Sequence, residues 1–388
     1  MSIRRRRWTT PLGEERTAWV VAYGTGKKRH IATFERKKEA EDYHAKVRVD
    51  RAQGLHIAPS QSITVREAGR LWIQACEANE LERTSVDTYR NYLDSHVLPF
   101  IGELKLSGIT VAVVKEFQDK LRKAEPERSP YMVKHAVAAL GAIIAEAQDR
   151  GLVAQNVVRA LKQRRRGKER QGERRARGKL RVGVDIPAPG EIDAILGAAG
   201  RWRPFFLVAA RCGLRSSELR GLQWQDVDFK RGLLHVCRRA DDYNALGPTK
   251  SETSNRAIPI PPATLAALRE WKLACPRRAG ELHYVFPNGA GNVENRGNIV
   301  NRGLIPVLLA AGVTVDGKPK YTGMHAFRHF FASWCINRKV DGGLELPLKV
   351  VQERLGHSSV VMTADRYGHL FPAGDDSAAL AAAEGRNG

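Results

Sequence analysis

Two arginines and one tyrosine in the second half of the chain are residue types that can act on a phosphate ester. Arg215 and Arg328 carry guanidinium groups, which stay charged at any relevant pH and bind two phosphate oxygens with matched bidentate geometry. Tyr367 carries a phenol, which can form a covalent phosphotyrosine and so conserve the energy of a broken bond for rejoining. These groups match the chemistry of cutting and rejoining a phosphodiester.

Three further side chains supply the proton donors and acceptors that such a reaction needs. His325 and His357 have ordinary pKa values close to neutral, so each can exchange a proton or hydrogen-bond a phosphate oxygen. Lys250 lies between two segments predicted as short strands, 233–239 and 256–260, in a turn that can reach a DNA groove. A lysine close to arginines can have its pKa pulled towards neutrality, which suits it to protonate a leaving oxygen.

A zinc site is the alternative interpretation of two histidines four residues apart. His325 and His329 have this spacing, but the motif H-E-x-x-H requires a glutamate where this chain has Ala326. The five cysteines are dispersed and form no C-x-x-C pair. We therefore predict no metal and no other cofactor.

The order of these motifs along the chain resembles that of the tyrosine recombinases of the phage integrase family. The resemblance is strong over residues 185–372, moderate over the middle region and only an outline over the first 60 residues. The motifs that carry it are RCGLRSSELRGL at 211–222, Thr249-Lys250-Ser251, His325-Ala-Phe-Arg-His329, Leu355-Gly-His357 and Tyr367.

The resemblance implies a role for each motif residue. Arg215 and Arg328 would clamp the scissile phosphate, and removing either is expected to lose most cleavage while the fold stays intact. His325 would assist deprotonation of the nucleophile Tyr367. By the same resemblance, Lys250 is the general acid, with Lys230 and Arg256 as alternatives in a different hairpin register. The resemblance also implies that His357 hydrogen-bonds the phosphate, that Glu218 supports Arg215 from the next helical turn, and that His329 buttresses its helix.

The periodicity of the chain predicts the elements that carry these residues. Residues 17–23 and 29–34 alternate as a hairpin, and 37–49 have helical spacing. Thr64 and Glu67 have the spacing of a capping box, which begins a helix to about residue 79. The remaining predicted elements are helices over 85–98, 110–123, 131–150, 191–199 and 204–213, breaks at Pro99, Gly102 and 126–130, the two short strands, and helices again from Pro262.

These elements, taken with the resemblance, predict a multidomain protein. Its fold class is a small β-hairpin/α arm-binding module, an all-α core-binding domain and a mainly α (α+β) catalytic domain. The expected ranges are 1–58 for the arm-type DNA-binding module, 62–160 for the core-binding domain, 161–184 for a basic linker, 185–372 for the catalytic domain and 373–388 for a C-terminal tail.

Charge points to a polyanionic partner. The chain has 64 Lys and Arg against 42 Asp and Glu, a net charge of +22. Two basic clusters are candidate DNA contacts: Arg4, Arg5, Arg6 and Arg7 near the start, and Arg164, Arg165 and Arg166 in the linker. Neither a signal peptide nor a membrane-spanning segment is apparent, and the unpaired cysteines fit a reducing compartment, so we expect a cytoplasmic protein in a bacterial host.

The expected function is that of an integrase of a phage or other mobile element. Such an enzyme cleaves and rejoins DNA through a 3′-phosphotyrosyl intermediate and a Holliday junction. Its implied partners are double-stranded attachment sites, three further copies in a homotetramer and an accessory directionality factor, with Leu370, Phe371 and Leu380 offering apolar contacts to a neighbouring subunit. Two rivals stay open: a type IB topoisomerase-like enzyme, and a decayed recombinase that binds DNA without catalysis.

Overall fold

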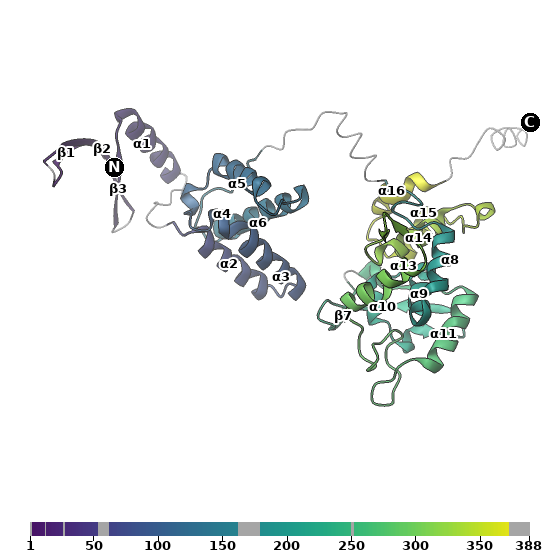
Figure 1. Cartoon of the computed structure of the whole chain (residues 1–388). Helices are drawn as coiled ribbons and strands as arrows, with labels where there is room; N and C mark the ends of the chain where they lie inside the picture. Colours follow the sequence, from purple (N-terminus) through teal and green to yellow (C-terminus); the bar gives the residue numbers. More distant parts are fainter. Residues whose placement is uncertain are drawn as a thin grey trace, which may run out of the picture. The chain divides into compact units, whose positions relative to one another are not determined.

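The computed structural model describes residues 2–11, 13–25, 28–52, 62–161, 179–249 and 252–371. The chain divides into two compact units, Met1–Arg165 and Arg166–Gly388 (Figure 1). Both are rich in helix and carry only small sheets, as expected of a multidomain, mainly helical protein. Within the described ranges, no helix is long and apolar enough to cross a membrane.

The first unit begins with a three-stranded antiparallel sheet and one helix. The strands pair in the order β1-β2-β3, and Val21 and Tyr23 of β2 pack with Ala40 and Val47 of α1. The predicted hairpin corresponds to β2 and β3, but β1 was not predicted, because four consecutive arginines hide any apolar alternation. The bounds are β1 Ser2–Thr9, β2 Glu15–Thr25, β3 Lys28–Phe34 and α1 Lys37–Ala52.

The register of β1 divides its four arginines between two faces of the sheet. Arg5 lies opposite Trp19, which packs against the apolar cluster shared with α1. Directly paired residues share a face and neighbours along a strand alternate, so Arg5 and Arg7 lie on the α1 side. Arg4 and Arg6 lie on the other side.

The rest of the first unit is a helical bundle around its own core. The predicted capping box is confirmed, because Glu67 N–H donates to the Thr64 hydroxyl and Thr64 N–H donates to the Glu67 carboxylate. The predicted break at Pro99 is wrong, since the chain stays helical from α3 through the π-helical turn η1 into α4, and Pro99 follows directly after that turn. The bounds are α2 Val65–Ala78, α3 Arg83–Tyr92, η1 Leu93–Val97, α4 Leu98–Ile101, η2 Leu106–Gly108, α5 Val111–Lys123 and α6 Pro130–Asp149.

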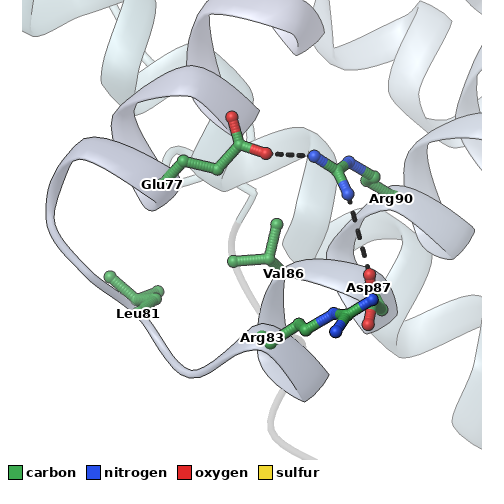
Figure 2. Close-up of a pocket in the computed structure, with 6 residues that line it drawn as sticks. All are labelled: Glu77, Leu81, Arg83, Val86, Asp87 and Arg90. Atoms are coloured by element: carbon green, nitrogen blue, oxygen red, sulfur yellow. Dashed lines mark hydrogen bonds and ion pairs between the residues drawn. The ribbon is translucent and has the colours of Figure 1, made fainter.

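A cavity of about 340 Å³ lies where α2 meets α3 (Figure 2). Arg90 crosses its wall and pairs with Glu77 of α2 and, at 3.7 Å, with Asp87 of its own helix. The Arg90–Glu77 ion pair therefore ties α3 to α2 beside the cavity. The cavity is lined by residues between Glu77 and Arg90, so it contains none of the motif residues, which begin at Arg211.

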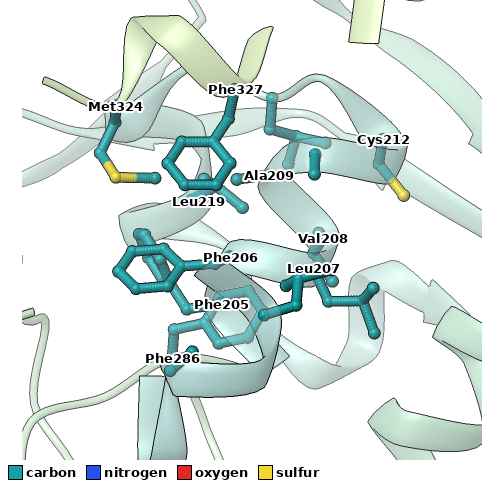
Figure 3. Packing of buried hydrophobic residues seen from close by; sticks show 14 of the residues in the cluster. Phe205, Phe206, Leu207, Val208, Ala209, Cys212, Leu219, Phe286, Met324 and Phe327 are labelled. Carbon is teal, nitrogen blue, oxygen red and sulfur yellow. The ribbon is translucent and has the colours of Figure 1, made fainter. Parts of the chain in front are cut away.

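The second unit is built around α9. Almost every side chain of this helix is buried, and Phe206 stacks on Phe327 of α14 with ring centroids 5.3 Å apart (Figure 3). Phe205 contacts Phe286 edge-on at 5.1 Å. The helices and single turns are α8 Pro189–Ala198, η3 Gly200–Trp202, α9 Arg203–Cys212, α10 Ser216–Gly221, η4 Trp224–Asp226, η5 Glu252–Ser254, α11 Pro262–Ala274, α12 Arg296–Asn298, η6 Ile299–Leu304, α13 Ile305–Ala310, α14 His325–Ile336, η7 Lys339–Asp341, α15 Leu348–Leu355, α16 Val360–Tyr367 and η8 Gly368–Leu370.

Short strands lie beside this helical core. A three-stranded antiparallel sheet has the order β4-β5-β8, and two further pairs are β6-β7 and β9-β10. The strand predicted over 233–239 is two strands, because the chain leaves the first sheet after Val236 and starts a separate hairpin at Arg238. The bounds are β4 Val227–Asp228, β5 Leu233–Val236, β6 Arg238–Ala240, β7 Leu246–Pro248, β8 Arg256–Pro259, β9 Thr314–Val315 and β10 Lys318–Pro319.

The last helices, α14, α15 and α16, gather at one end of this unit (Figure 1). Phe331, Leu355 and Tyr367 share one buried cluster there, and Leu370 and Phe371 pack against it. Both side chains are only partly buried by this packing, so the expected contact of Leu370 and Phe371 with a neighbouring subunit stays a prediction. Leu380 lies outside the described residues.

Candidate active site

The site begins at the sharp turn between α9 and α10. Gly213 ends α9 with a left-handed φ of 67°, and an added Cβ would meet the Phe331 ring at 2.1 Å. Two residues later, Arg215 stands at the start of α10. Its guanidinium donates to Glu218 at 2.7 Å and to the Gly356 carbonyl at 3.0 Å, so it joins α10 to the end of α15.

Glu218 is the buried anion on which the cations of the site converge. Its two oxygens accept from Arg215 at 2.7 Å and from Arg256 at 2.9 Å, and its side chain is almost wholly buried. Burial alone would raise the pKa of this carboxyl, but Arg256, Arg215 and Arg328 together lower it to about 2. Glu218 is therefore ionised at neutral pH and holds two guanidinium groups in place.

Arg328 lies on α14 and is only 2% exposed. It donates to the Gly213 carbonyl at 2.8 Å and to the Leu355 carbonyl. Burial, followed by the charge of Arg215, lowers its pKa to about 9, which leaves it protonated at neutral pH. Arg328 thus braces α9, α14 and α15 with a positive charge at their junction.

Tyr367, at the end of α16, is a core residue that meets α14. Its side chain is 1% exposed, and its hydroxyl lies 2.6 Å from Nδ1 of His329. Burial raises the pKa of the phenol to about 12, against the opposing charges of Arg328 and Arg366. Burial lowers the pKa of His329 to about 3, with His325 and Arg366 adding to the effect. Both partners are therefore neutral at pH 7.

His357 flanks the tyrosine from the other side. Its ring is parallel to that of Tyr367 with centroids 6.5 Å apart, and Nδ1 hydrogen-bonds with the Thr363 hydroxyl at 2.9 Å. Burial, then Arg328 and Arg215, lower its pKa to about 3. His357 is therefore neutral at pH 7.

His325 begins α14 one helical turn before His329, and the two rings meet edge-on at 4.8 Å. His325 keeps an exposed face, and partial burial with the charges of Arg328 and Arg366 lowers its pKa to about 4. The tyrosine hydroxyl is hydrogen-bonded to His329 and not to His325. The hydrogen-bond partner of the tyrosine differs from the expected one. The expectation was that His325 assists the tyrosine and that His329 only supports its helix.

The remaining predicted residues fall in different parts of the chain. Lys250 lies outside the described residues, as do Arg164, Arg165 and Arg166. Arg4 to Arg7 lie in the first unit on the exposed strand β1. The structure thus brings together Arg215, Glu218, His325, Arg328, His329, His357 and Tyr367.

Arg256 is a site residue that sequence reasoning did not assign. It is buried at the start of β8 and, besides Glu218, reaches the Arg354 carbonyl at 2.7 Å and the Ser254 carbonyl at 2.9 Å. Its nearness in sequence to Lys250 was the only signal available, because nothing in the spacing shows that β8 lies beside α15. Arg256 contributes positive charge and fixes Glu218.

Comparisons with known proteins agree with this geometry. The family model "Phage integrase family" matches residues 191–373, and "Phage integrase, N-terminal SAM-like domain" matches residues 64–122. A tyrosine recombinase XerC-like protein of Caldanaerobacter subterraneus subsp. tengcongensis is 27% identical over 87% of this chain and 86% of its own. The ICEBs1 integrase of Bacillus subtilis is 29% identical over 44% of this chain and 45% of its own.

Solved structures share the fold at low identity. The Tn1549 transposon integrase in complex with a circular intermediate DNA has a TM-score of 0.61 and 17% identity, covering 83% of this chain and 99% of that one. A lambda integrase tetramer bound to a Holliday junction has a TM-score of 0.56 and 14% identity, covering 91% and 95%. With both family models matched and one relative aligned along most of its length, the chain belongs to the phage integrase family and is a tyrosine-type site-specific recombinase.

Proposed function

We propose that Tyr367 is the nucleophile of this recombinase and that it becomes joined to the 3′ side of the cleaved strand. In this step the bond from the phenolic oxygen to phosphorus forms and the bond from phosphorus to the 5′ oxygen breaks. A free 5′ hydroxyl of the partner duplex then attacks the phosphotyrosine, and two such exchanges make and resolve a Holliday junction. The observation that supports this most is the convergence of the buried phenol with two histidines and Arg328.

Arg215 and Arg328 carry the charge of the transferring phosphoryl group in this proposal. A positive centre fixed before the reaction stabilises the developing charge without the cost of reorganisation. The Arg215 side chain is 31% exposed and can reach a phosphate directly, whereas Arg328 is buried behind it. The clamp therefore has an outer guanidinium that contacts substrate and an inner one that braces the site.

His329 is the proton acceptor for the nucleophile. A neutral phenol is the donor and a neutral imidazole the acceptor that the two shifted pKa values favour, across a 2.6 Å contact. As the phenolic oxygen attacks phosphorus, its proton passes to Nδ1 of His329. His325 and His357, neutral on either side, hydrogen-bond the phosphate oxygens.

Lys250 donates the proton that the 5′ oxygen needs on leaving. It is the second residue after β7, on the chain that returns from the β6–β7 hairpin towards Arg256. An alkoxide is a poor leaving group, so this proton is as important as the attack itself.

In this proposal, different parts of the chain have different roles on DNA. Residues 62–160 act as a core-binding domain and 185–372 as the catalytic domain, joined by the basic linker 161–184 and preceded by the arm-binding module 1–58. Four copies bind two attachment sites, as the lambda integrase tetramer binds a Holliday junction. The tail 373–388 joins neighbouring subunits, and an accessory protein sets the direction of the reaction.

The test is a search for covalent protein–DNA adducts. Duplexes taken from beside the protein's own gene carry a nick next to each candidate cleavage position, so that the released fragment diffuses away. On a denaturing gel, the wild type forms an adduct and Tyr367→Phe forms none although it binds the same duplex. An equal adduct in Tyr367→Phe, or tight specific binding without any adduct, contradicts the proposal.

His329 is tested on the same substrate against His325. Replacing the acceptor in His329→Phe keeps the ring packing and slows adduct formation by about a hundredfold, the usual contribution of a proton acceptor. His325→Phe changes a group that does not touch the phenol and leaves the pH dependence of attack unaltered. The reverse order of effects returns the proton-accepting role to His325.

A further inference from the structure

Arg220 is a buried cation that the proposed chemistry does not use. It lies on α10, five residues after Arg215, and is 1% exposed. Its guanidinium donates to three oxygens that belong to other elements: the Glu294 carbonyl at 2.7 Å, the Ala240 carbonyl at 3.4 Å and the side-chain oxygen of Asn244. All three partners are uncharged acceptors. The planar guanidinium therefore joins α10 to these other segments by hydrogen bonds and not by ion pairs.

Two of these partners belong to the β6–β7 hairpin. Ala240 ends β6, and Asn244 lies in the tight loop that leads to β7. Asp241 orders this loop by accepting from the backbone N–H groups of Tyr243 and Ala245, both at 2.9 Å. Asn244 has a left-handed φ of 64°, which asparagine tolerates better than most residues, and this turns its amide towards Arg220.

The next residue of α10 makes the same contact from the backbone. A Cβ added to Gly221 would lie 2.9 Å from backbone atoms of Arg239 and 3.0 Å from the Ala240 nitrogen. Because that approach is closer than a side chain permits, α10 lies directly against β6. Across the hairpin, Arg239 donates to the Pro248 carbonyl at 3.2 Å, so β7 follows β6.

We propose that Arg220 and Gly221 anchor the β6–β7 hairpin to the helix that begins at Arg215, and that Arg220 is thereby a positioning residue for Lys250. The inference rests on the proposed role of Lys250, which follows β7 by two residues. One short helix then carries the phosphate clamp at its start and holds, at its end, the hairpin from which the chain continues to Lys250.

The surroundings of Arg220 fit this role. Burial lowers its pKa, and the nearby carboxylates of Asp242 and Asp241 oppose that shift, so the guanidinium stays charged. Arg296 pairs with Asp242 at 3.4 Å and adds a second, exposed link from α12 to the same loop. The hairpin loop is therefore held from α10 and α12 together.

The experiment separates the departure of the 5′ oxygen from every other step. Two nicked duplexes carry the cleavage site found by the adduct assay, one with the ordinary 5′ oxygen and one with sulfur in its place. A thiolate leaves without a proton, so a defect in the general acid disappears on the sulfur substrate. Single-turnover cleavage of both substrates is measured for the wild type, Lys250→Ala, Arg220→Met, Asn244→Gly and Asn244→Asp.

We expect Arg220→Met to cleave the oxygen substrate about tenfold more slowly and the sulfur substrate at nearly the wild-type rate. Asn244→Gly keeps the left-handed turn but removes the oxygen acceptor, and it shows a smaller defect, about threefold, with the same rescue. Asn244→Asp restores an acceptor and most of the activity. Circular dichroism and urea unfolding check that each variant is folded.

Two outcomes overturn the inference. A folded Arg220→Met that cleaves the oxygen substrate at the wild-type rate shows that the anchor is dispensable. Equal defects on both substrates place Arg220 with the clamp and not with the general acid. If sulfur fails to rescue Lys250→Ala itself, the assigned role of Lys250 is wrong, which is a separate failure. Should Arg220→Met not fold, the pair Asn244→Gly and Asn244→Asp decides alone.

Discussion

The two arginines of the proposed clamp differ in how deeply their side chains are buried. Arg215 has nearly a third of its side chain exposed, so Arg215→Ala is expected to fold and to lose cleavage by about a hundredfold or more. Arg328→Ala leaves the carbonyls of Gly213 and Leu355 unpaired in a buried junction, at a cost of about 3–5 kcal/mol of unfolding free energy. The structure therefore predicts a loss of stability in Arg328→Ala that the sequence does not reveal, and the expectation that both variants stay folded remains a prediction.

Urea unfolding of the two variants measures this difference. Arg338→Ala is the control, because its pair with Asp341 is exposed and its loss should change stability by no more than about 0.5 kcal/mol. An Arg328→Ala variant as stable as the wild type would contradict the bracing role.

The buried histidines predict a loss of stability in mild acid. His329 and His357 have pKa values of about 3 in the folded protein and an ordinary value of 6.5 unfolded. Below pH 6.5 the unfolded chain therefore binds more protons, and the free energy of unfolding falls as pH falls. From pH 7.5 to pH 5 each histidine should cost about 2 kcal/mol. Unfolding of the DNA-free protein at both pH values measures the drop, which should be smaller by about 2 kcal/mol in His329→Phe.

Residue types, spacing and the family resemblance singled out residues that the structure brings together, but not their contacts. Arg215, His357 and Tyr367 stand in motifs that the resemblance picks out from many other arginines, histidines and tyrosines. The His329–Tyr367 hydrogen bond depends on how α16 docks on α14, two helices separated by α15 and its loops. No local pattern encodes that docking, and the resemblance assigned His325 as the partner of the tyrosine.

At the scale of elements, the turn at Gly213 carries the clearest prediction. Gly213→Ala suffers both a left-handed φ of 67° and a collision with the Phe331 ring, whereas Gly312→Ala has the same φ and no atom within 4 Å of its Cβ. The control should lose about 1 kcal/mol of stability and Gly213→Ala at least about 3 kcal/mol. Thermal unfolding compares them, and equal losses would mean that Phe331 simply moves aside.

Helix and strand positions were predicted correctly where they depend on residues close together in the sequence. The capping box at Thr64 was predicted correctly because all its partners lie within four residues. The prediction failed at β1, whose arginines give no pattern, and at residues 233–239, where a change of sheet follows Val236. Strand β1 pairs with its neighbour β2, whereas residues 233–236 pair with β8, about twenty residues later, which local periodicity does not encode.

At the scale of the whole molecule, the net charge of +22 predicts DNA binding that weakens steeply with salt. The register of β1 predicts which arginines of the arm-binding module contact DNA. Arg4 and Arg6 lie on the face away from α1, and we expect that face to bind the phosphates. A double variant Arg4→Ala/Arg6→Ala should reduce the slope of log affinity against log salt by about 2 on arm-site DNA. The matched pair Arg5→Ala/Arg7→Ala should change it less. Identical slopes for the two pairs would remove the face assignment.

The burial of Tyr367 bears on when the proposed nucleophile can react. In the DNA-free protein the phenol is 1% exposed and hydrogen-bonded to His329 of the same subunit. Under the proposed mechanism, a phosphate must therefore gain access to the phenol without separating it from His329. Chance contacts with DNA that do not open the site in this way would leave the strands uncut.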